Sequence, residues 1–418
     1  MIDIELIRKT PDIVRESLRK RNMGESVLDE VIAADEGWRK TLTEINQMRK
    51  ERNELAREIA NSEDRERLIL GTKEIAEGIA KKESDLKAIE EKRFSLLSRI
   101  PNIILPSVPY GKSDDDNVEI KRRGTVKALD FEPKDHVDIG LALDLFDIER
   151  AAKVSGARFF YLKGDAVFLE LALVRYAFDA LLKEGFVPVI PPVLTREFAL
   201  FGTGFLPFGE ENIYRIKGED LCLVGTAEVP LGAMHSNEIF SHKELPKYYA
   251  GFSTCFRTEA GAHGKDTKGI FRVHQFDKIE MFKYCLPEES ESEHEKLLQT
   301  AERIYQGLGI PYRVVEVCSG ELGASAAKKY DIEAFLPGQK EYREVVSCSN
   351  CLDYQARRLM IRYRSKEGDI KFVHTLNSTA IAIERTMVAI LENYQQGDGS
   401  VLVPKALQQF MGKERIDK

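Results

Sequence analysis

The sequence contains no run of about 18 apolar residues, which is the length that a membrane-spanning helix needs. Six cysteines in 418 residues are too few to indicate a disulfide framework. The opening segment, MIDIELIRKTPDIVRESLRK, has no apolar centre and carries acidic residues, which disfavours a secretory signal or a transit peptide. No GxxxxGK[ST] motif is present, so a P-loop is excluded. Together these absences predict a cytoplasmic protein with no membrane partner.

The chain also lacks an overall basic character, because its net charge is −7. Any nucleic-acid binding must therefore depend on a local patch. An apolar fraction of 43% is enough for a sizeable core, and the length of 418 residues predicts about two to four domains.

Residues 27–100 contain no proline and only three glycines. Heptad positions occur on both sides of a turn at 61–64: Trp38, Ile45, Arg52 and Ile59 before it, and Leu68, Ile75, Lys82, Ile89 and Leu96 after it. This pattern predicts an antiparallel coiled-coil hairpin. Each helix would have about 34 residues and a length of about 50 Å.

The hairpin has two interpretations. Its seam includes Arg49, Arg52, Lys82 and Arg93, which weakens it as a zipper. Residues 39–61 carry six basic and four acidic side chains, and residues 65–99 carry nine and seven. This excess of basic residues favours an arm that touches a polyanion, but a purely structural hairpin stays open.

The pattern changes after the hairpin. Residues 107–125 are polar and rich in turn residues, which indicates a linker or surface loop. Short apolar runs then alternate with helical stretches, such as 166–183 followed by FVPVIPP at 186–192. Strands and helices without regular βαβ spacing predict an α+β domain on an antiparallel sheet flanked by helices.

The segment FRTEAGAHGKDTKGIFRVHQFDKIE spans residues 256–280. In a strand, residues two apart share a face, so two sets of side chains should point together: Arg257 with Glu259, and Arg272, His274, Phe276, Lys278 and Glu280. The glycine-containing loop between them suits a long hairpin connection. Such a face of charged and aromatic groups favours a flat, charged ligand, because burying it empty is costly.

Three further segments place polar residues among apolar ones: 223–228, 344–348 and 375–395. In the last, Ser378 or Thr379 is expected to cap a buried helix, with Arg385 in its second turn. Arg385 must meet an anion or form an internal salt bridge. Arginines from separate segments can grip a polyphosphate. Glu344 and Ser347 offer the oxygen ligands that Mg²⁺ prefers.

These residues resemble the signatures of class II aminoacyl-tRNA synthetases. Arg257-Thr258-Glu259 with FRVHQF (271–276) is similar to the second signature, the run that ends at Arg385 to the third, and GFVPVIPP (185–192) to the first. Thr226-Ala227-Glu228, EVVSCSNCLDYQARR (344–358) and the hairpin make the whole chain resemble seryl-tRNA synthetases. The resemblance implies a tRNA-binding domain at 1–106, with its arm at about 27–100, a catalytic domain at 107–418, and a homodimer.

The resemblance also implies the site. Arg257 and Arg385 would be catalytic. ATP would contact Arg257, Thr258, Glu259, Arg272, Val273, Phe276, Glu344, Val345, Val346, Ser347 and Arg385, with Mg²⁺ on Glu344 and Ser347. L-serine would contact Thr226, Ala227, Glu228, Glu280, Asn377 and Thr379, although many bacterial members have Gly-Ser where this chain has Ser378-Thr379. The loop 260–270 and the arm would contact tRNA(Ser). Charging of tRNA(Sec) stays open.

Other interpretations compete with serine–tRNA ligase activity. A related ligase could load an amino acid onto a carrier protein, and a non-catalytic adaptor could keep only the fold. Zinc at Cys348 and Cys351 is disfavoured, because no second ligand pair accompanies them. Serine activation by a synthetase needs no imidazole base, so no catalytic role is expected for His263, His274 or His374. The acidic run 114–116 is read as a solvated loop.

Overall fold

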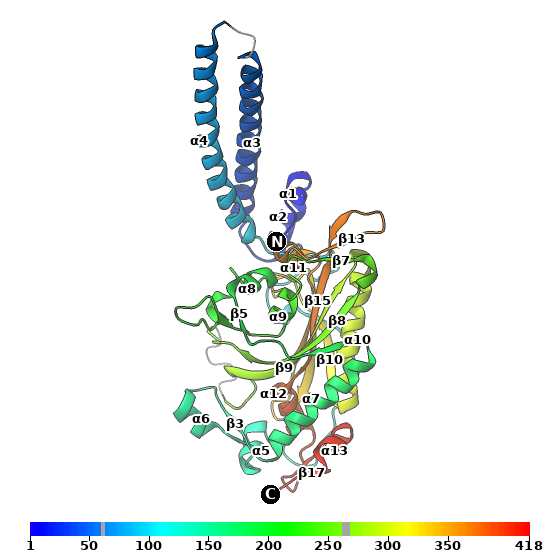
Figure 1. Cartoon of the computed structure of the whole chain (residues 1–418). Coiled ribbons are helices and arrows are strands. Elements are labelled where there is room, and N and C mark those ends of the chain that lie inside the picture. The colour runs from blue at the N-terminus through cyan, green and yellow to red at the C-terminus, as the bar shows by residue number, and fades with distance from the viewer. Residues whose placement is uncertain (60–62, 261–267) are drawn as a thin grey trace. The chain divides into compact units, whose positions relative to one another are not determined.

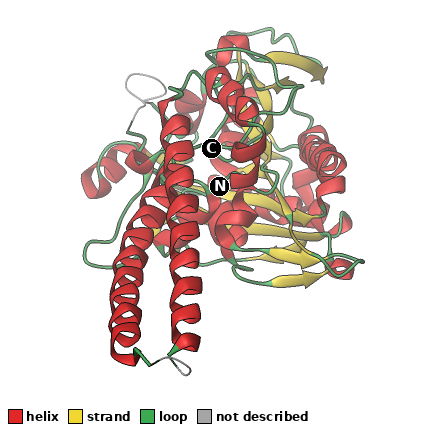
Figure 2. Cartoon of the chain, turned by 90° about the horizontal axis from the view of Figure 1, so that it is seen from above, coloured by secondary structure: helices red, strands yellow, loops and turns green. Residues whose placement is uncertain are grey.

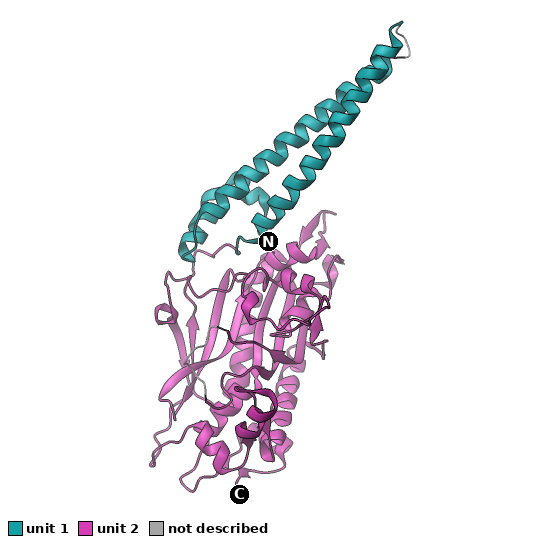
Figure 3. Cartoon of the chain, turned by 90° about the vertical axis from the view of Figure 1, so that its left-hand side faces the viewer, with its two compact units in different colours: residues 1–101 teal, residues 102–418 magenta. Residues whose placement is uncertain are grey.

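The computed structural model describes residues 1–59, 63–260 and 268–418. It divides into two compact units, residues 1–101 and 102–418 (Figure 3). Half of the predicted turn at 61–64 and most of the loop 260–270, including His263, lie outside the described residues. None of the described helices is both long enough and apolar enough to cross a membrane.

The first unit is helical. Two short helices precede the predicted pair, and the four are α1 (Ile4–Lys9), α2 (Pro11–Lys20), α3 (Ser26–Glu58) and α4 (Arg65–Ser98). Figures 1 and 2 show α3 and α4 side by side along their length, as the heptads predict. Ile45 and Ile79 are buried in the seam.

Several basic seam residues have acidic partners in this unit. Arg49 Nη2 lies 2.7 Å from Glu83 Oε1, and Lys82 Nζ lies 2.5 Å from Glu44 Oε2. The guanidinium of Arg93 covers the Trp38 ring at 4.2 Å. These contacts show how a coiled coil accommodates basic residues at its seam.

The second unit is built on an eight-stranded sheet in the order β1-β10-β11-β12-β15-β9-β8-β4. In that order the strands are Val118–Arg123, Tyr312–Glu316, Lys328–Leu336, Glu341–Asn350, His374–Ala382, Gln275–Cys285, Lys247–Phe256 and Val187–Val189. Every pair is antiparallel except β4 with β8. The predicted α+β class with an antiparallel sheet is confirmed.

Helices cover one face of this sheet and leave part of the other face for the site. Helix α10 (Ser290–Leu308) packs on β12 and β15, and α7 (Asp165–Lys183), α12 (Ile383–Asn393) and α13 (Lys405–Met411) complete the layer. Ile279 and Met281 of β9 join this apolar core. Because side chains alternate along a strand, Phe276, Lys278 and Glu280 point away from it.

The remaining elements of the second unit are short. They are α5 (His136–Ala142), β2 (Phe146–Asp147), α6 (Ile148–Ser155), β3 (Tyr161–Leu162), β5 (Leu194–Thr195), α8 (Glu197–Thr203), β6 (Cys222–Leu223), α9 (Glu228–Ala233), β7 (Ile239–Ser241), α11 (Tyr354–Leu359), β13 (Arg362–Arg364), β14 (Ile370–Phe372), β16 (Val401–Leu402) and β17 (Arg415–Ile416). Asp114–Asp116 forms a single 3-10 turn in which Asp116 accepts the backbone N–H of Lys112 at 2.7 Å.

Two expectations about local structure are wrong. Residues 118–123, predicted as part of a linker, form edge strand β1, because they pair with β10. Ser378 and Thr379 do not cap a helix, because both lie inside β15, and α12 starts only at Ile383 after Ala382. Arg385 therefore lies in the first turn of α12, not in a second turn. An apolar run alone did not distinguish the buried central strand from the helix that follows it.

Candidate active site

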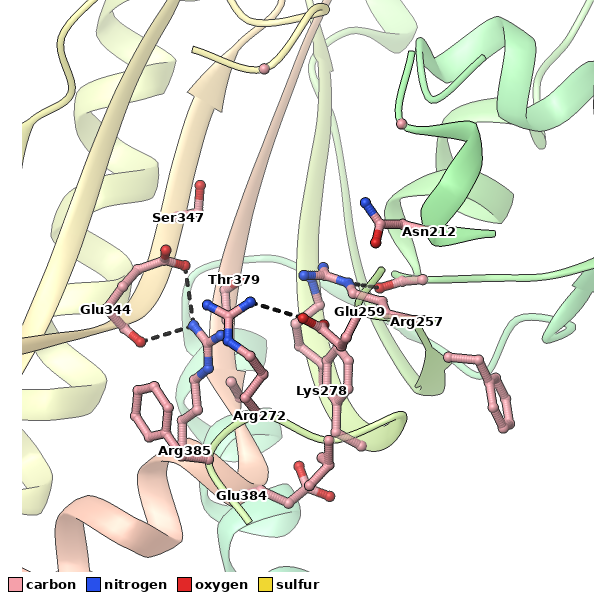
Figure 4. A pocket seen from close by; sticks show the side chains of 18 of the residues that line it. Asn212, Arg257, Glu259, Arg272, Lys278, Glu344, Ser347, Thr379, Glu384 and Arg385 are labelled. Atoms are coloured by element: carbon pink, nitrogen blue, oxygen red, sulfur yellow. Dashed lines mark hydrogen bonds and ion pairs between the residues drawn. The ribbon is translucent and has the colours of Figure 1, made fainter. Parts of the chain in front are cut away.

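Segments far apart in the sequence enclose one cavity of about 880 Å³ on the open face of the sheet. The cavity wall brings together many of the predicted residues: Arg257, Glu259, Arg272, Val273, Phe276, Glu344, Val345, Ser347, Thr379 and Arg385. Figure 4 shows that several of their charged side chains converge on one another. Most residues predicted to contact adenine, phosphate or a metal therefore lie close together in the folded chain.

Two irregularities in strand pairing direct these side chains into the cavity. Residues three apart in a regular strand point to opposite faces. In β12 the register shifts between the pairs Val346–Ile332 and Glu344–Glu333, leaving Val345 without an opposite residue. This bulge lets Glu344 and Ser347 line the same cavity. In β15 the register shifts again between Thr379 and Ile381, which lets Thr379 and Ala382 line the same cavity although they are three residues apart.

The predicted hairpin of residues 256–280 is present, but its strands are shorter than expected. Strand β8 ends at Phe256 and β9 begins at Gln275, so Arg257, Glu259, Arg272 and His274 lie beyond the strand ends. Glu259 has a left-handed backbone (φ 51°), which turns the chain away from the ladder. The ring of His274 is hydrogen-bonded by Nδ1 to the Arg257 carbonyl at 3.0 Å, as expected for a structural histidine.

Two arginine–carboxylate pairs occupy the cavity. Arg272 Nη1 donates to Glu259 Oε2 at 2.8 Å, and Arg385 Nη1 lies 3.3 Å from Glu344 Oε1 and 2.9 Å from the Glu344 carbonyl. The internal salt bridge considered for Arg385 is thus observed, at the wall of the cavity (Figure 4). Arg257 donates through Nε to the Gly225 carbonyl at 3.2 Å and covers the Phe276 ring at 5.2 Å.

The cavity wall carries five basic and four acidic side chains: Arg257, Arg272, Lys278, Lys329 and Arg385, and Glu259, Glu321, Glu344 and Glu384. The Glu344 side chain is 47% exposed. Desolvation at the cavity wall acts to raise its pKa, but Arg385, Lys329, Arg257 and Arg272 outweigh this effect and hold the pKa below its usual value. Four cations from separate elements therefore act on one carboxylate. Such an arrangement suits a bound polyanion, because charge-assisted bonds to phosphate need cations from several directions.

A buried polar network adjoins the cavity and contains four of the six predicted serine contacts, whereas Thr379 lines the cavity itself. Thr226 Oγ1 donates to Glu280 Oε2 at 3.3 Å, and Glu280 pairs with Lys278. Asn377 Nδ2 donates to Glu228 Oε1 at 2.9 Å. Burial, followed by the charge of Glu280, raises the pKa of Glu228 to about 7. Two neighbouring carboxylates beside a cationic cavity can receive an ammonium group.

Some residues predicted to contact ATP or serine lie outside the cavity wall. The Thr258 hydroxyl donates to the Glu211 carbonyl, and Val346 lies in the apolar core on the helical face. Ala227 lies in a smaller apolar cluster with Leu231. None of these three residues lines the cavity. The same is true of Thr226, Glu228, Glu280 and Asn377, which belong to the polar network beside it.

The donor set for a metal is limited. Within the described ranges no group of three His, Cys, Asp or Glu side chains is arranged to hold a metal ion. Glu344 and Ser347 still supply hard oxygen atoms that fit Mg²⁺, an ion that usually binds one or two protein groups plus substrate phosphates. All six cysteines are free and buried, and burial raises the pKa of Cys348 to about 12.

Three residues at or beside the cavity have no role among the sequence-based predictions. Lys329 lines the cavity from β11, and its Nζ lies 3.0 Å from Asp331 Oδ2. The strand alternation predicts that Lys278 shares a face with Phe276 and Glu280 but predicts no role for it, and Lys278 also lines the cavity. Gln355 donates to Glu228 Oε1 at 2.8 Å from helix α11. Gln355 lies within the segment 344–358 that supports the family resemblance, but only the fold brings β11 and α11 to this site.

Comparisons with known proteins agree with this geometry. Residues 213–394 match the model described as the tRNA synthetase class II core domain (G, H, P, S and T). A prolyl-tRNA synthetase from Giardia lamblia, solved with prolyl-adenylate, covers 65% of this chain and 53% of its own; at 18% identity and a TM-score of 0.57 it shares the fold alone. The fold is that of a class II aminoacyl-tRNA synthetase.

Residues 1–104 match the model described as the seryl-tRNA synthetase N-terminal domain. Serine–tRNA ligases from Dictyoglomus turgidum and Treponema denticola are 49% and 47% identical over 100% of this chain and 99% and 100% of their own. The crystal structure of seryl-tRNA synthetase from Pyrococcus horikoshii complexed with ATP has a TM-score of 0.97, with 47% identity over 100% of this chain and 99% of that one. The chain belongs to the seryl-tRNA synthetase family, and it is an ATP-dependent ligase of that family.

Proposed function

We propose that this chain activates L-serine with ATP and then transfers serine to the 3′-terminal ribose of tRNA(Ser). The observation that carries the proposal is the convergence of Arg257, Arg272, Lys329 and Arg385 on Glu344 at the wall of one cavity. A polyphosphate can replace Glu344 and Glu259 as the partner of these cations. The family relationship and the ATP bound by the Pyrococcus relative support the same assignment.

In the first step a serine carboxylate oxygen attacks the α-phosphorus of ATP. A new P–O bond forms, the bond to the bridging oxygen breaks, and pyrophosphate leaves with the electron pair. The nucleophile is already ionised, so no general base is required. Arg257 would hold the α-phosphate and the serine carboxylate, while Arg272 and Arg385 would hold the outer phosphates. In the second step the ribose hydroxyl attacks the adenylate carbonyl and AMP leaves.

The adenine and metal contacts are assigned to residues of the cavity wall, and the serine contacts mostly to the polar network beside it. Glu259 would accept the adenine amino group, Phe276 would stack on the ring, and Val273 would add backbone contacts. Glu344 and Ser347 would hold Mg²⁺, which when bound neutralises charge on the phosphates. Serine would lie among Thr226, Glu228, Glu280, Asn377 and Thr379, whose hydroxyl, carboxylate and amide groups suit its ammonium and hydroxyl. A site built to bond a hydroxyl rejects alanine, because its polar groups would be left unpaired.

We assign tRNA binding to the N-terminal region (1–106) and catalysis to the remainder (107–418). The arm formed by α3 and α4 would contact tRNA(Ser) through its exposed basic residues, since several seam cations already have acidic partners. tRNA(Sec) is a second acceptor to be tested in the same assay. We place the enzyme in the cytoplasm.

We also propose a homodimer. Helix α7 and the region of edge strand β4 expose large apolar side chains: Phe168 (59%), Leu171 (59%), Leu182 (52%), Val187 (54%) and Ile190 (81%). These residues belong to the first signature and the helix before it. A second copy of the chain would cover this surface, and sedimentation measurements would reveal its mass.

The test is serine-dependent ATP–pyrophosphate exchange without tRNA, with alanine, threonine and glycine as controls. We expect exchange with serine alone. Arg257→Ala should lower exchange at least about 100-fold, because a preorganised charge opposite the reacting phosphate is lost. Arg364→Ala is the matched control, since Arg364 is exposed on β13 and bonds only the Gly368 carbonyl among the described residues. Near-normal exchange in Arg257→Ala would refute the assignment.

A further inference from the structure

The carboxylate of Glu228 is held by only one of its two oxygens. Glu228 begins helix α9, and the residue is 8% exposed. Gln355 Nε2 and Asn377 Nδ2 donate to the same atom, Oε1, at 2.8 and 2.9 Å. No hydrogen bond from the described residues reaches Oε2. The two bonds fix the rotation of the carboxylate and leave one oxygen for another donor.

Gln355 is itself fixed in one orientation. It lies on α11 and is 0% exposed. Thr375 Oγ1 donates to its carbonyl Oε1 at 2.7 Å, and its amide nitrogen also donates to the Thr203 carbonyl at 2.9 Å. Rotating the amide by 180° would place its carbonyl oxygen against the Glu228 carboxylate. The chain from Thr375 through Gln355 therefore determines that an N–H, and not an oxygen, faces Glu228.

From this geometry we infer that Gln355, oriented by Thr375, is a positioning residue for amino-acid recognition: it aims the free oxygen of Glu228 at the substrate ammonium. The inference deepens the proposed function and rests on it, because it requires Glu228 to meet the ammonium. None of Gln355, Thr375 and Glu228 lines the cavity wall itself. Glu228 is 8% exposed whereas Gln355 and Thr375 are 0% exposed, so both act through Glu228.

The charges around Glu228 explain why such support is needed. Burial and then the charge of Glu280 raise its pKa to about 7, while the Gln355 bond, Lys278 and Arg257 lower it. The buried thiol of Cys351 is the other titratable group close to it. A hydrogen bond to the charged form opposes the desolvation cost. Losing the Gln355 donor should therefore move the protonation of Glu228 to higher pH.

The test uses the full-length enzyme in serine-dependent ATP–pyrophosphate exchange, with KM for serine, KM for ATP and kcat measured from pH 5.5 to 8.5. Gln355→Met should raise KM for serine about 10- to 100-fold, the effect of losing one hydrogen bond to a charged group. KM for ATP should stay constant. The acid limb of kcat/KM for serine should move to higher pH, which a merely structural role would not cause.

Thr375→Val keeps the side-chain shape and removes the donor that orients Gln355. It should change KM for serine in the same direction by a smaller factor, and Thr375→Ser should restore the wild-type value. If Gln355→Met does not fold, the comparison of Thr375→Val with Thr375→Ser tests the positioning role instead. Unchanged serine KM and pH profile in Thr375→Val would overturn the inference.

Glu228→Gln separates this inference from the proposed function. If Glu228→Gln raises KM for serine while the Gln355 and Thr375 variants behave as wild type, only the positioning role is wrong. If Glu228→Gln itself leaves KM for serine unchanged, the assignment of Glu228 to the serine ammonium is wrong, and the inference fails with it.

Discussion

Asp35 of α3 should be the main electrostatic support of the N-terminal unit. Its carboxylate is 3% exposed and accepts four bonds: from Arg8 Nε at 2.8 Å, Arg8 Nη2 at 2.7 Å, Arg93 Nη1 at 2.9 Å and Arg39 Nε at 3.1 Å. Arg8 lies on α1 and Arg93 on α4. One carboxylate therefore joins three helices of the unit.

Asp35→Asn should lower the stability of this unit by about 3 kcal/mol. The amide keeps one acceptor oxygen but loses the charge and turns an N–H₂ group toward the arginines. Removing one partner of a fully buried ion pair costs about 3–5 kcal/mol. Here the Arg8 and Arg93 side chains are 25% and 18% exposed and can regain some water, so the lower end of that range applies.

Hydrogen exchange at pH 7 on the full-length chain measures this effect directly. A loss of about 3 kcal/mol corresponds to a fall of more than about 100-fold in the protection of slowly exchanging α3 and α4 amides. Asp29→Asn is the matched control, because Asp29 is on the same helix, is 61% exposed and bonds only Arg15 among the described residues. Equal protection in both variants and the wild type would refute the reasoning.

The same carboxylate should make the unit sensitive to acid. Burial acts to raise the pKa of Asp35, but the bonds from Arg8 and Arg93 outweigh it, so its pKa lies below the usual 3.8. A lowered pKa stabilises the fold above pH 3.8, and that contribution is lost as the pH falls through the folded-state pKa. Asp35→Asn should remove this part of the acid transition.

Three further predictions concern other parts of the chain. Deleting residues 30–97 should leave serine activation intact and abolish tRNA charging; unchanged charging would show that the arm is only structural. Burial lowers the pKa of His294 from 6.5 to about 4, so the unfolded state binds more protons than the folded state between these pH values. The free energy of unfolding should therefore fall by about 3 kcal/mol from pH 6.5 to 4. Urea titrations of His294→Gln should show a weaker dependence of this free energy on pH, and an unchanged dependence would contradict the assignment. Gly140→Ala should lower stability by about 1–3 kcal/mol, because its Cβ would lie 2.0 Å from the Phe146 ring; thermal unfolding without a shift would show that the ring can move.

The sequence by itself determined the features that depend on local pattern. The heptads specified the helix pair α3 and α4, since a seven-residue apolar repeat is stable mainly as paired helices. The alternation through Phe276, Lys278 and Glu280 placed these side chains on one face of β9. The segments that contain Arg257 and Arg385 place charged residues among apolar ones in a pattern that indicates a phosphate site and resembles the signatures of one family. Each of these signals is carried by residues close together in the chain.

The tertiary structure decided the features that depend on neighbouring strands. Ser378 and Thr379 lie in a strand because β12 and β9 flank them on either side, and no property of the apolar run itself specifies this. The bulges at Val345 and between Thr379 and Ile381 put Glu344, Ser347 and Thr379 into one cavity. A bulge depends on the register of two strands, and that register is absent from either segment alone.

The same holds for the residues that act from a distance. Lys329 reaches the cavity from β11, and Gln355 reaches Glu228 from α11, 127 positions away in the sequence. Lys329 belongs to no motif, and the segment 344–358 that contains Gln355 does not by itself show which residue its amide meets. The role of each side chain arises only when folding removes water and leaves it next to a buried charge, where one hydrogen bond has a large effect.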